Sequence, residues 1–207
     1  MGTQQERIQQ TDEAIIKALL TVGKTKPLAQ ITISDITRVS GINRGTFYLH
    51  YLDKNDLVTQ LTTRLLNQIQ TILNHEMAGT MDYHYFSIDR PYPIITHLVH
   101  MIGANKARLH FLLSANGDPE FYVTVTNKLQ TAILKELQQM KGSRQFRADI
   151  PDKYAIRLIT NAILTIITMW IESSDDLTET AIAQLIMKSL YVAPYQMLGL
   201  GLHPDKP

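Results

Sequence analysis

Residues 32–56 constrain the fold more than any other part of this sequence, because they join two short helical patterns through a glycine. Thr32 and Asp35 have the spacing of a capping box, in which each side chain accepts a hydrogen bond from the other residue's backbone at a helix start. Gly41 follows where the chain must turn, since glycine adopts a left-handed backbone without steric cost. With Asn43 placed to cap the second helix, the segment has the layout of a DNA-binding helix-turn-helix.

Three strings in this region resemble the N-terminal domain of the TetR family of bacterial transcriptional regulators. They read Ile-Thr-Ile-Ser-Asp-Ile at 31–36, Gly-Ile-Asn-Arg-Gly-Thr-Phe-Tyr-Leu-His-Tyr at 41–51 and Asp-Lys-Asn-Asp-Leu at 53–57. Looser similarity follows at 113–121 and around Trp170. The resemblance implies an all-α fold, with an N-terminal three-helix helix-turn-helix DNA-binding domain over 1–52 and a larger C-terminal helical domain for effector binding and dimerisation over 53–207.

Apolar residues outside the motif recur at helical spacing along most of the chain. This spacing predicts helices over about residues 5–22, 55–75, 94–103, 106–114, 119–140, 155–170 and 177–190. Residues 121–126 have the composition of a strand, but their apolar positions continue a helical face as far as Met140. Residues 79–93 are predicted to form a loop whose aromatic residues at 83–86 pack against the body, and residues 199–207 are predicted to form a loose tail.

Composition limits the remaining possibilities without identifying a function. The 20 basic and 19 acidic side chains give a net charge of +1, which is low for a nucleic-acid-binding protein, so the DNA interpretation rests on the motif. The absence of cysteine excludes a disulfide framework and fits the reducing cytoplasm, where we place the protein. Residues 1–12 lack the apolar core of a secretory signal, and the charge-free apolar stretch at 158–171 is too short to span a bilayer, so no membrane partner is expected.

Patterns typical of catalytic or metal sites do not stand out. The sequence contains no glycine-rich phosphate loop, no Gly-x-Ser-x-Gly turn and no paired acid motif, so neither an enzyme nor a cofactor is expected. His97 and His100 lie three residues apart, with His110 further on. No neighbouring carboxylate or cysteine completes a ligand set, so these histidines are assigned to a pocket or to the surface rather than to a metal.

Hydrogen-bond donors concentrate in the second short helix of the motif. Arg44 can bond O6 and N7 of a guanine, and Gly45 allows the backbone to approach the DNA closely. Tyr48 and His50 can donate to phosphates, and Lys54 can do so from the start of the next helix. The predicted DNA-binding residues are Thr32, Asn43, Arg44, Gly45, Thr46, Tyr48, His50 and Lys54. The alternative interpretation is an ordinary polar helix face.

Apolar residues are assigned to the interior or to a subunit contact. Phe47 and Tyr51 are predicted to lie in the core, whereas Leu52 stands where the TetR family often has a basic residue that contacts a phosphate. The helix predicted over 155–170 is apolar around much of its circumference, which indicates burial on several sides. One side can face the second subunit of a homodimer. The predicted interface residues are Ile159, Ile163, Ile166, Trp170, Ile182, Leu185 and Ile186. The alternative is that they form core alone.

Large side chains on separate predicted helices can converge on an effector cavity. The candidates are His97, Met101, Phe111, Phe121, Tyr122 and Trp170. Methionine and aromatic side chains suit apolar or aromatic molecules, and no charge cluster among them favours a strongly anionic effector. The alternative is that these side chains simply fill the core.

The sequence therefore predicts a sequence-specific DNA-binding transcriptional regulator, a ligand-responsive repressor that acts as a homodimer on a palindromic operator. Its expected partners are double-stranded operator DNA, a second copy of the chain and a small-molecule effector. Two alternatives stay open. The helical body can instead bind a protein partner, which makes the chain a structural or interaction protein, or the regulator can bind DNA without any effector.

Overall fold

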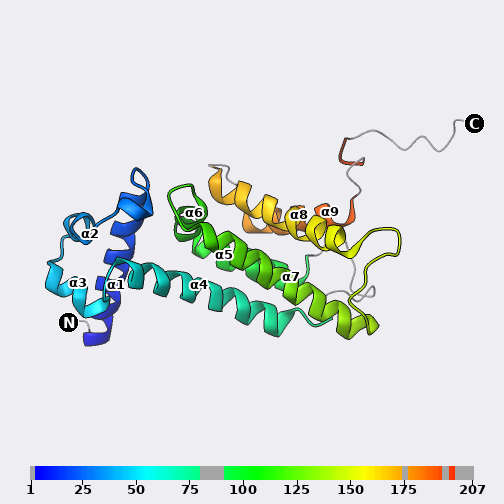
Figure 1. The fold of residues 1–207 in the computed structure, drawn as a ribbon, viewed down its shortest axis with the longest axis horizontal. Helices are drawn as coiled ribbons and strands as arrows, with labels where there is room; N and C mark the ends of the chain where they lie inside the picture. The colour runs from blue at the N-terminus through cyan, green and yellow to red at the C-terminus, as the bar shows by residue number, and fades with distance from the viewer. Residues whose placement is uncertain (1–2, 80–90, 174–176, 193–195, 199–207) are drawn as a thin grey trace, which may run out of the picture. The chain divides into compact units, whose positions relative to one another are not determined.

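The computed structural model describes residues 3–79, 91–173, 177–192 and 196–198. Its regular structure within these residues is entirely helical (Figure 1), which confirms the predicted all-α fold class. The helices are α1 (Gln4–Gly23), η1 (Leu28–Gln30), α2 (Ile33–Ser40), α3 (Arg44–His50), α4 (Lys54–Glu76), α5 (Pro93–Ala104), α6 (Lys106–Leu113), α7 (Pro119–Lys141), α8 (Asp152–Glu172), α9 (Glu179–Tyr191) and η3 (Gln196–Leu198).

Most of the helices predicted from apolar spacing are found within a few residues of the predicted bounds. The strand-like composition at 121–126 does not produce a strand, because the segment lies inside α7 and continues its helical face. The predictions for the aromatic residues at 83–86 and for the tail at 199–207 fall outside the described residues.

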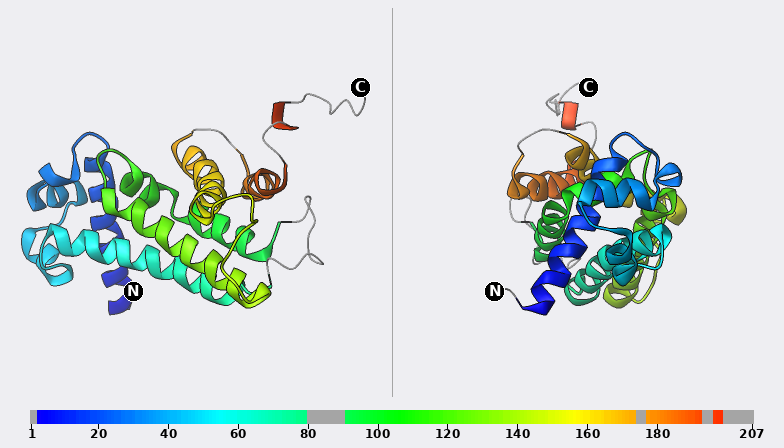
Figure 2. Two further views of the ribbon diagram at one scale, coloured as in Figure 1. Left: turned by 45° about the vertical axis from the view of Figure 1, so that its right-hand side comes forward. Right: turned by 90° about the vertical axis from the view of Figure 1, so that its left-hand side faces the viewer.

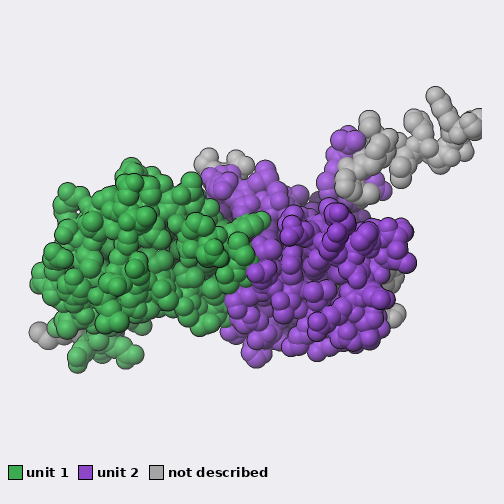
Figure 3. All heavy atoms as spheres, in the orientation of Figure 1, with its two compact units in different colours: residues 1–68, 105–125 green, residues 69–104, 126–207 purple. Residues whose placement is uncertain are grey.

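The chain divides into two compact units, which Figure 3 shows in different colours. Unit 1 contains residues 1–68 and 105–125, and unit 2 contains residues 69–104 and 126–207. The division falls inside α4 and α7. It groups residues by packing, whereas the boundary predicted at residue 52 separates a DNA-binding module from the rest, so that boundary stays a prediction.

Unit 1 is built around α1, which contacts α2 and α6, while α2 contacts α3 (Figure 2). Phe47 of α3 and Tyr51 at its end are 0% and 2% exposed, which confirms their assignment to the core. Gly23 ends α1 directly against the ring of Phe111. A Cβ at residue 23 would lie 2.3 Å from a ring carbon, so only glycine allows α6 to approach α1 this closely.

Unit 2 contains α5, α8 and α9, with α9 in contact with both of the others (Figure 2). The indole N–H of Trp170 donates to the carbonyl of Leu177 at 3.1 Å and so joins the end of α8 to the segment before α9. Glu136 of α7 is almost fully buried, and its carboxylate accepts a hydrogen bond from the backbone N–H of Gly79 at 2.7 Å.

The helix α8 is longer than the charge-free stretch at 158–171, and by length and composition alone it could cross a membrane. A single such helix is weak evidence, because the core helix of a soluble protein passes the same test. Only 28% of its most apolar window is buried within the structure, so α8 keeps apolar surface that its own unit does not cover.

Candidate functional site

Both halves of the capping box that begins α2 are formed. The Thr32 hydroxyl accepts from the Asp35 backbone N–H at 3.2 Å, and the Asp35 carboxylate accepts from the Thr32 N–H at 3.0 Å. Gly41 ends the helix with φ of 73°, in the left-handed region where a side chain would be strained, and its N–H donates to the Thr37 carbonyl. The sequence therefore sets the length of α2 and the direction of the turn locally.

A cation holds the capping carboxylate in place. The Lys26 ammonium lies 2.6 Å from the Asp35 carboxylate, and Arg38 approaches the other oxygen at 3.4 Å. The hydrogen bond from Lys26, followed by those from the Thr32 N–H and hydroxyl, lowers the pKa of Asp35 well below its usual range. Because Asp35 also accepts from the Thr32 hydroxyl at 2.8 Å, that hydroxyl is already engaged in the cap.

The helix α3 carries the densest group of predicted DNA-binding residues. Asn43 caps it by accepting from the Thr46 N–H at 2.8 Å, and it also accepts from the Thr46 hydroxyl at 3.2 Å. Arg44 and Gly45 are exposed at its start, and Tyr48 is 49% exposed one turn on. The Tyr48 ring meets the ring of the buried Phe47 edge-on, with 5.8 Å between the ring centroids, and the rest of its side chain is exposed. The exposed face of α3 therefore presents a guanidinium, a bare backbone and a phenol to solvent.

Two leucines outside the predicted DNA contacts are exposed here, Leu49 on α3 and Leu52 just after its end. Leu49 is 85% exposed and Leu52 is 82% exposed, the largest values among the exposed apolar side chains of the described residues. Leu49 lies four residues after Gly45 and therefore on the same side of α3. The spacing from Gly45 therefore indicates from the sequence that Leu49 lies on the side of α3 predicted to face DNA. The predicted contacts did not include Leu49 because they were based mainly on hydrogen-bonding groups, which its side chain lacks.

A polar network fixes the end of α3 to α1 and α4 within unit 1. The Tyr51 hydroxyl donates to Asp12 of α1, and the Arg64 guanidinium of α4 donates to the same carboxylate at 2.6 Å. Burial raises the pKa of Asp12, but the hydrogen bonds from Arg64 and Tyr51 outweigh it and the pKa is lowered. Burial, with the contact to Asp12, raises the pKa of Tyr51 far above its usual value. Asp12, Tyr51 and Arg64 are far apart in the chain, so no local sequence pattern indicates this network.

Lys54 has a structural partner as well as its predicted role. Its ammonium donates to the carbonyls of Leu28 and Ala29 at 2.6 and 3.2 Å and so ties the start of α4 to η1. An ammonium has three donors, which leaves one for a phosphate. The phosphate contact stays a prediction, and the structure adds a second reason for a lysine at this position.

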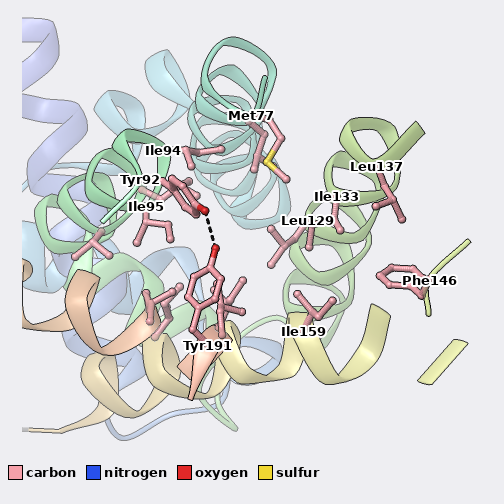
Figure 4. A pocket seen from close by; sticks show the side chains of 17 residues that line it. Met77, Tyr92, Ile94, Ile95, Leu129, Ile133, Leu137, Phe146, Ile159 and Tyr191 are labelled. Carbon is pink, nitrogen blue, oxygen red and sulfur yellow. Dashed lines mark hydrogen bonds between the residues drawn. The ribbon is translucent and has the colours of Figure 1, made fainter. Parts of the chain in front are cut away.

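Unit 2 contains a cavity of about 360 Å³ whose lining is almost entirely apolar. It lies among α4, α5, α7, α8 and α9 (Figure 4). The lining residues are Leu73, Met77, Tyr92, Ile94, Ile95, Leu98, Val99, Leu129, Ile133, Leu137, Phe146, Ile159, Ile163, Ile167, Ile186, Leu190 and Tyr191. The hydroxyls of Tyr92 and Tyr191 are hydrogen-bonded at 2.6 Å, and burial, with this bond, raises the pKa of Tyr191 far above its usual value.

The six residues predicted for an effector cavity do not line it. Phe111, Phe121 and Tyr122 belong to unit 1, where the first two are buried. Met101 and Trp170 are buried in unit 2 outside the lining, and His97 pairs with Glu76 at 2.5 Å. Aromatic residues and methionine were chosen as typical pocket residues, but here the cavity is bounded mainly by isoleucine and leucine, whose helical spacing also predicts a solid core.

The residues predicted for a subunit interface occupy three different environments. Trp170, Ile182 and Ile186 are buried within the protomer, and Ile186 lines the cavity together with Ile159 and Ile163. Ile166 is half-buried, and Leu185 is 43% exposed. The buried residues face their own unit because α8 and α9 pack on each other.

A different set of apolar residues on α8 and α9 is exposed. On α8 these are Tyr154, Leu158 and Met169, at 56%, 66% and 63%. They recur at spacings of four and eleven residues, and therefore follow one side of the helix. Leu185 of α9 is the exposed member of the predicted interface. Within the described residues, no group of three or more metal-ligating side chains gathers, and the three histidines discussed above form none.

A helix-turn-helix with an exposed second helix, joined in one chain to a helical unit with an apolar cavity, defines an all-helical protein of the helix-turn-helix class. Residues 89–191 match a TetR family model described as the transcriptional regulator C-terminal region. The chain is 29% identical over 154 residues to YxbF, an uncharacterized HTH-type transcriptional regulator of Bacillus subtilis (strain 168). That match covers 74% of this chain and 39% of the relative, so the chain spans well under half of that protein's length.

Solved structures share the fold over most of the chain. A TetR transcriptional regulator from Streptococcus agalactiae 2603V has a TM-score of 0.55 at 18% identity, covering 89% of this chain and 95% of that one. A transcriptional regulator of the TerR/AcrR family from Aquifex aeolicus VF5 has a TM-score of 0.58 at 12% identity, covering 87% and 97%. The protein belongs to the TetR family of transcriptional regulators, which is not a family of enzymes.

Proposed function

We propose that this protein is a cytoplasmic repressor that binds a palindromic operator as a homodimer and releases it when a small molecule occupies the cavity of unit 2. The exposed face of α3 carries the proposal. Arg44, Gly45 and Tyr48 are exposed on a short helix whose position is fixed by the cap at Asn43 and by the buried Phe47. Residues 1–52 act in this proposal as the DNA-binding domain and residues 53–207 as the effector and dimerisation domain.

The division of labour on α3 follows from the chemistry of each side chain. Arg44 can make a two-pronged contact with O6 and N7 of guanine, which distinguishes guanine from the other bases in the major groove. Tyr48, His50, Thr46 and Lys54 serve phosphates, which fix the register of the helix without reading sequence. Thr32 and Asn43 contribute mainly as caps that hold α2 and α3.

A homodimer is part of the proposal because one seven-residue helix buries too little DNA surface for tight specific binding. Two copies related by a two-fold axis repeat the contact, and the operator then repeats its half-site. The surface best suited to a second copy is the exposed apolar strip of Tyr154, Leu158 and Met169 on α8 with Leu185 on α9, here named the α8–α9 strip. The half-buried Ile166 borders it.

DNA binding is tested by selecting bound sequences from a random duplex library and measuring affinity for the selected site by fluorescence anisotropy. Arg44→Ala is expected to lose about 1–3 kcal/mol on that site and to relax the base preference at one position. Arg144→Ala removes an exposed arginine between α7 and α8 and serves as the control, with unchanged affinity expected. Equal affinities of the two variants for the selected site would place sequence reading elsewhere.

The salt dependence of DNA binding distinguishes the proposed regulator from the alternative, a protein that binds only a protein partner. Binding to random duplex DNA should weaken with rising salt, since each neutralised phosphate releases counterions. Lys54→Ala is expected to weaken binding to all sequences alike and to reduce the salt slope by about one unit. A chain that binds neither selected nor random DNA would contradict the proposal and favour a protein partner.

Dimerisation is tested by light scattering on the full chain. Leu158→Glu combined with Met169→Glu places two charges in the α8–α9 strip, where an unpaired charge would be buried in the dimer, so a monomer is expected. Met140→Glu changes an exposed methionine on α7, outside the strip, and should stay a dimer. A dimer in both variants moves the interface to another surface.

A further inference from the structure

The lining of the cavity in unit 2 specifies the charge of the molecule that it can hold. Among the described residues, isoleucine, leucine, valine, methionine and phenylalanine supply the lining, apart from Tyr92 and Tyr191. No lysine, arginine, histidine, aspartate or glutamate is among them. A carboxylate or ammonium enclosed by these side chains would lose hydration and gain no ion partner from them, which is costly, so the described lining favours a neutral molecule.

The two tyrosines supply the polar side-chain atoms of this lining. Figure 4 shows them on one side of the cavity, with Phe146 on the other. Their hydroxyls bond each other at 2.6 Å, and either can be the donor. If Tyr92 donates, its oxygen keeps a lone pair, and if it accepts, it keeps its own proton. In the first case Tyr92 can accept from a hydroxyl of a bound molecule, and in the second it can donate to a hydroxyl or carbonyl oxygen.

The volume and the side-chain types describe the rest of the molecule. About 360 Å³ lies within the range of small-molecule sites in proteins. Branched aliphatic side chains from α5, α7 and α8, among them Ile95, Ile133 and Ile163, bound most of the space, so contact is made mainly with methyl and methylene groups. A hydrocarbon body gains from this burial in proportion to its area.

We propose that the cavity binds a neutral, mainly aliphatic molecule with a single hydroxyl or carbonyl group, and that this group meets the Tyr92 hydroxyl. The inference deepens the effector control proposed above and takes from it only that the cavity is a ligand site. Binding to the cavity can be measured without DNA, so the two proposals fail separately.

The test uses three molecules that share one chain and differ in charge. The protein is loaded with the neutral fluorescent probe N-phenyl-1-naphthylamine, which is then displaced by dodecan-1-ol, dodecanoate or dodecyltrimethylammonium. The two ions are kept below their micellar concentrations and the alcohol below its solubility limit. The alcohol is expected to bind at least about tenfold more tightly than either ion, because neither charge has a partner in the lining. An ion that binds as tightly as the alcohol overturns the inference.

A matched pair of variants locates the bound probe. Ile163→Phe reduces the volume of the cavity and is expected to weaken probe binding about tenfold, whereas Ile166→Phe makes the same change on α8 at a half-buried residue outside the lining. Equal probe affinity in the two folded variants overturns the assignment of the cavity. Circular dichroism checks that both are folded, and Ile159→Phe repeats the test from another lining position.

The polar end is tested by removing one oxygen. Tyr92→Phe is expected to weaken dodecan-1-ol about two- to tenfold while leaving the probe unaffected. Tyr122→Phe, on an exposed tyrosine of α7 outside the lining, should change neither. If both variants bind the alcohol like the unaltered protein, the Tyr92 contact is overturned. An alcohol that binds the cavity but leaves operator affinity unchanged supports this inference and contradicts the effector role proposed above.

Discussion

The helix α3 and the cavity of unit 2 differ in what surrounds them. Phe47, beneath the outward face of α3, is fully buried, and Asp12, Tyr51 and Arg64 form charged hydrogen bonds at the end of the helix. The cavity has the opposite character: its described lining is mainly aliphatic, and the Tyr92 and Tyr191 hydroxyls in it bond each other, neutral group to neutral group. One region is held in a single position by directional contacts, while the other leaves space that no side chain fills.

This difference indicates which structural changes each region tolerates. A helix that must place donors against fixed DNA atoms benefits from directional bonds that allow one position only. A cavity lined by non-directional contacts can adjust to a guest, since apolar packing tolerates small rearrangements more readily than a broken ion pair does. Substitutions that remove side-chain volume should therefore lower the free energy of unfolding more beneath α3 than at the cavity. Substitutions that remove one hydroxyl oxygen should also lower it most beside α3.

The largest effect is expected on the free energy of unfolding, when a buried side chain of unit 1 and a cavity-lining side chain of unit 2 are each truncated to alanine. Phe47→Ala should lower the free energy of unfolding by about 3–5 kcal/mol, because the ring is enclosed on all sides. Ile163→Ala should cost about 2 kcal/mol or less, since part of that side chain faces empty space and has fewer contacts to lose. Urea unfolding followed by circular dichroism measures both. Equal costs would mean that the cavity is filled in solution, which would break the comparison.

A smaller effect is expected from the network that ends α3. Tyr51→Phe removes the hydroxyl that donates to Asp12 and should cost about 1.5–3 kcal/mol, the range for hydrogen bonds to charged groups. The same substitution at Tyr92, whose hydroxyl bonds a neutral partner, should cost about 1 kcal/mol. A larger loss at Tyr92 than at Tyr51 would show that polar contacts are not the distinguishing property of unit 1.

The pH dependence of stability should also distinguish the regions. The folded-state pKa of Asp12 lies below its ordinary value of 3.8, so its contribution is present above that value and is lost as the pH falls through the lower folded-state pKa. Stability should therefore decline below about pH 4. Asp12→Asn should make the free energy of unfolding less dependent on pH there, while Asp35, whose pKa is also lowered, keeps part of the decline. An unchanged acid profile in Asp12→Asn would show that Asp12 is not coupled to folding.

The local features of α2 and α3 were predictable from sequence because their causes lie within a few residues. Thr32 and Asp35 cap each other three residues apart, and Gly41 turns the chain by its own backbone freedom. The Asp12 network was not predictable, because it joins residues 39 and 52 positions apart. No local rule specifies such contacts, and they appear only when α1, α3 and α4 have packed.

The cavity could not be predicted from the sequence for a different reason. A stripe of isoleucine at helical spacing indicates a buried face, but it gives no sign of whether facing stripes interlock or leave a gap. The choice of Phe111, Phe121 and Trp170 as effector contacts relied on residue type, whereas position along each helix decides which side chains face the cavity. Leu49 shows the converse, since its place on the outward face of α3 follows from helical spacing even though its residue type gave no hint of a contact.

The smallest expected effect concerns that leucine and would sharpen the description of α3 as a surface of donors alone. Leu49 is 85% exposed on the face that we propose enters the major groove, where thymine offers a methyl group. Leu49→Ala should weaken binding to the selected operator by about 0.8 kcal/mol for each methylene group that DNA covers. Replacing single thymines by deoxyuridine in that operator should cost the unaltered protein a similar amount of binding free energy at one position and cost Leu49→Ala nothing there.

Tyr122→Ala, which truncates an exposed side chain on α7, is the control and should keep full sensitivity to deoxyuridine. Should no thymine position distinguish Leu49→Ala from the unaltered protein, the leucine makes no methyl contact and α3 reads bases through its donors only.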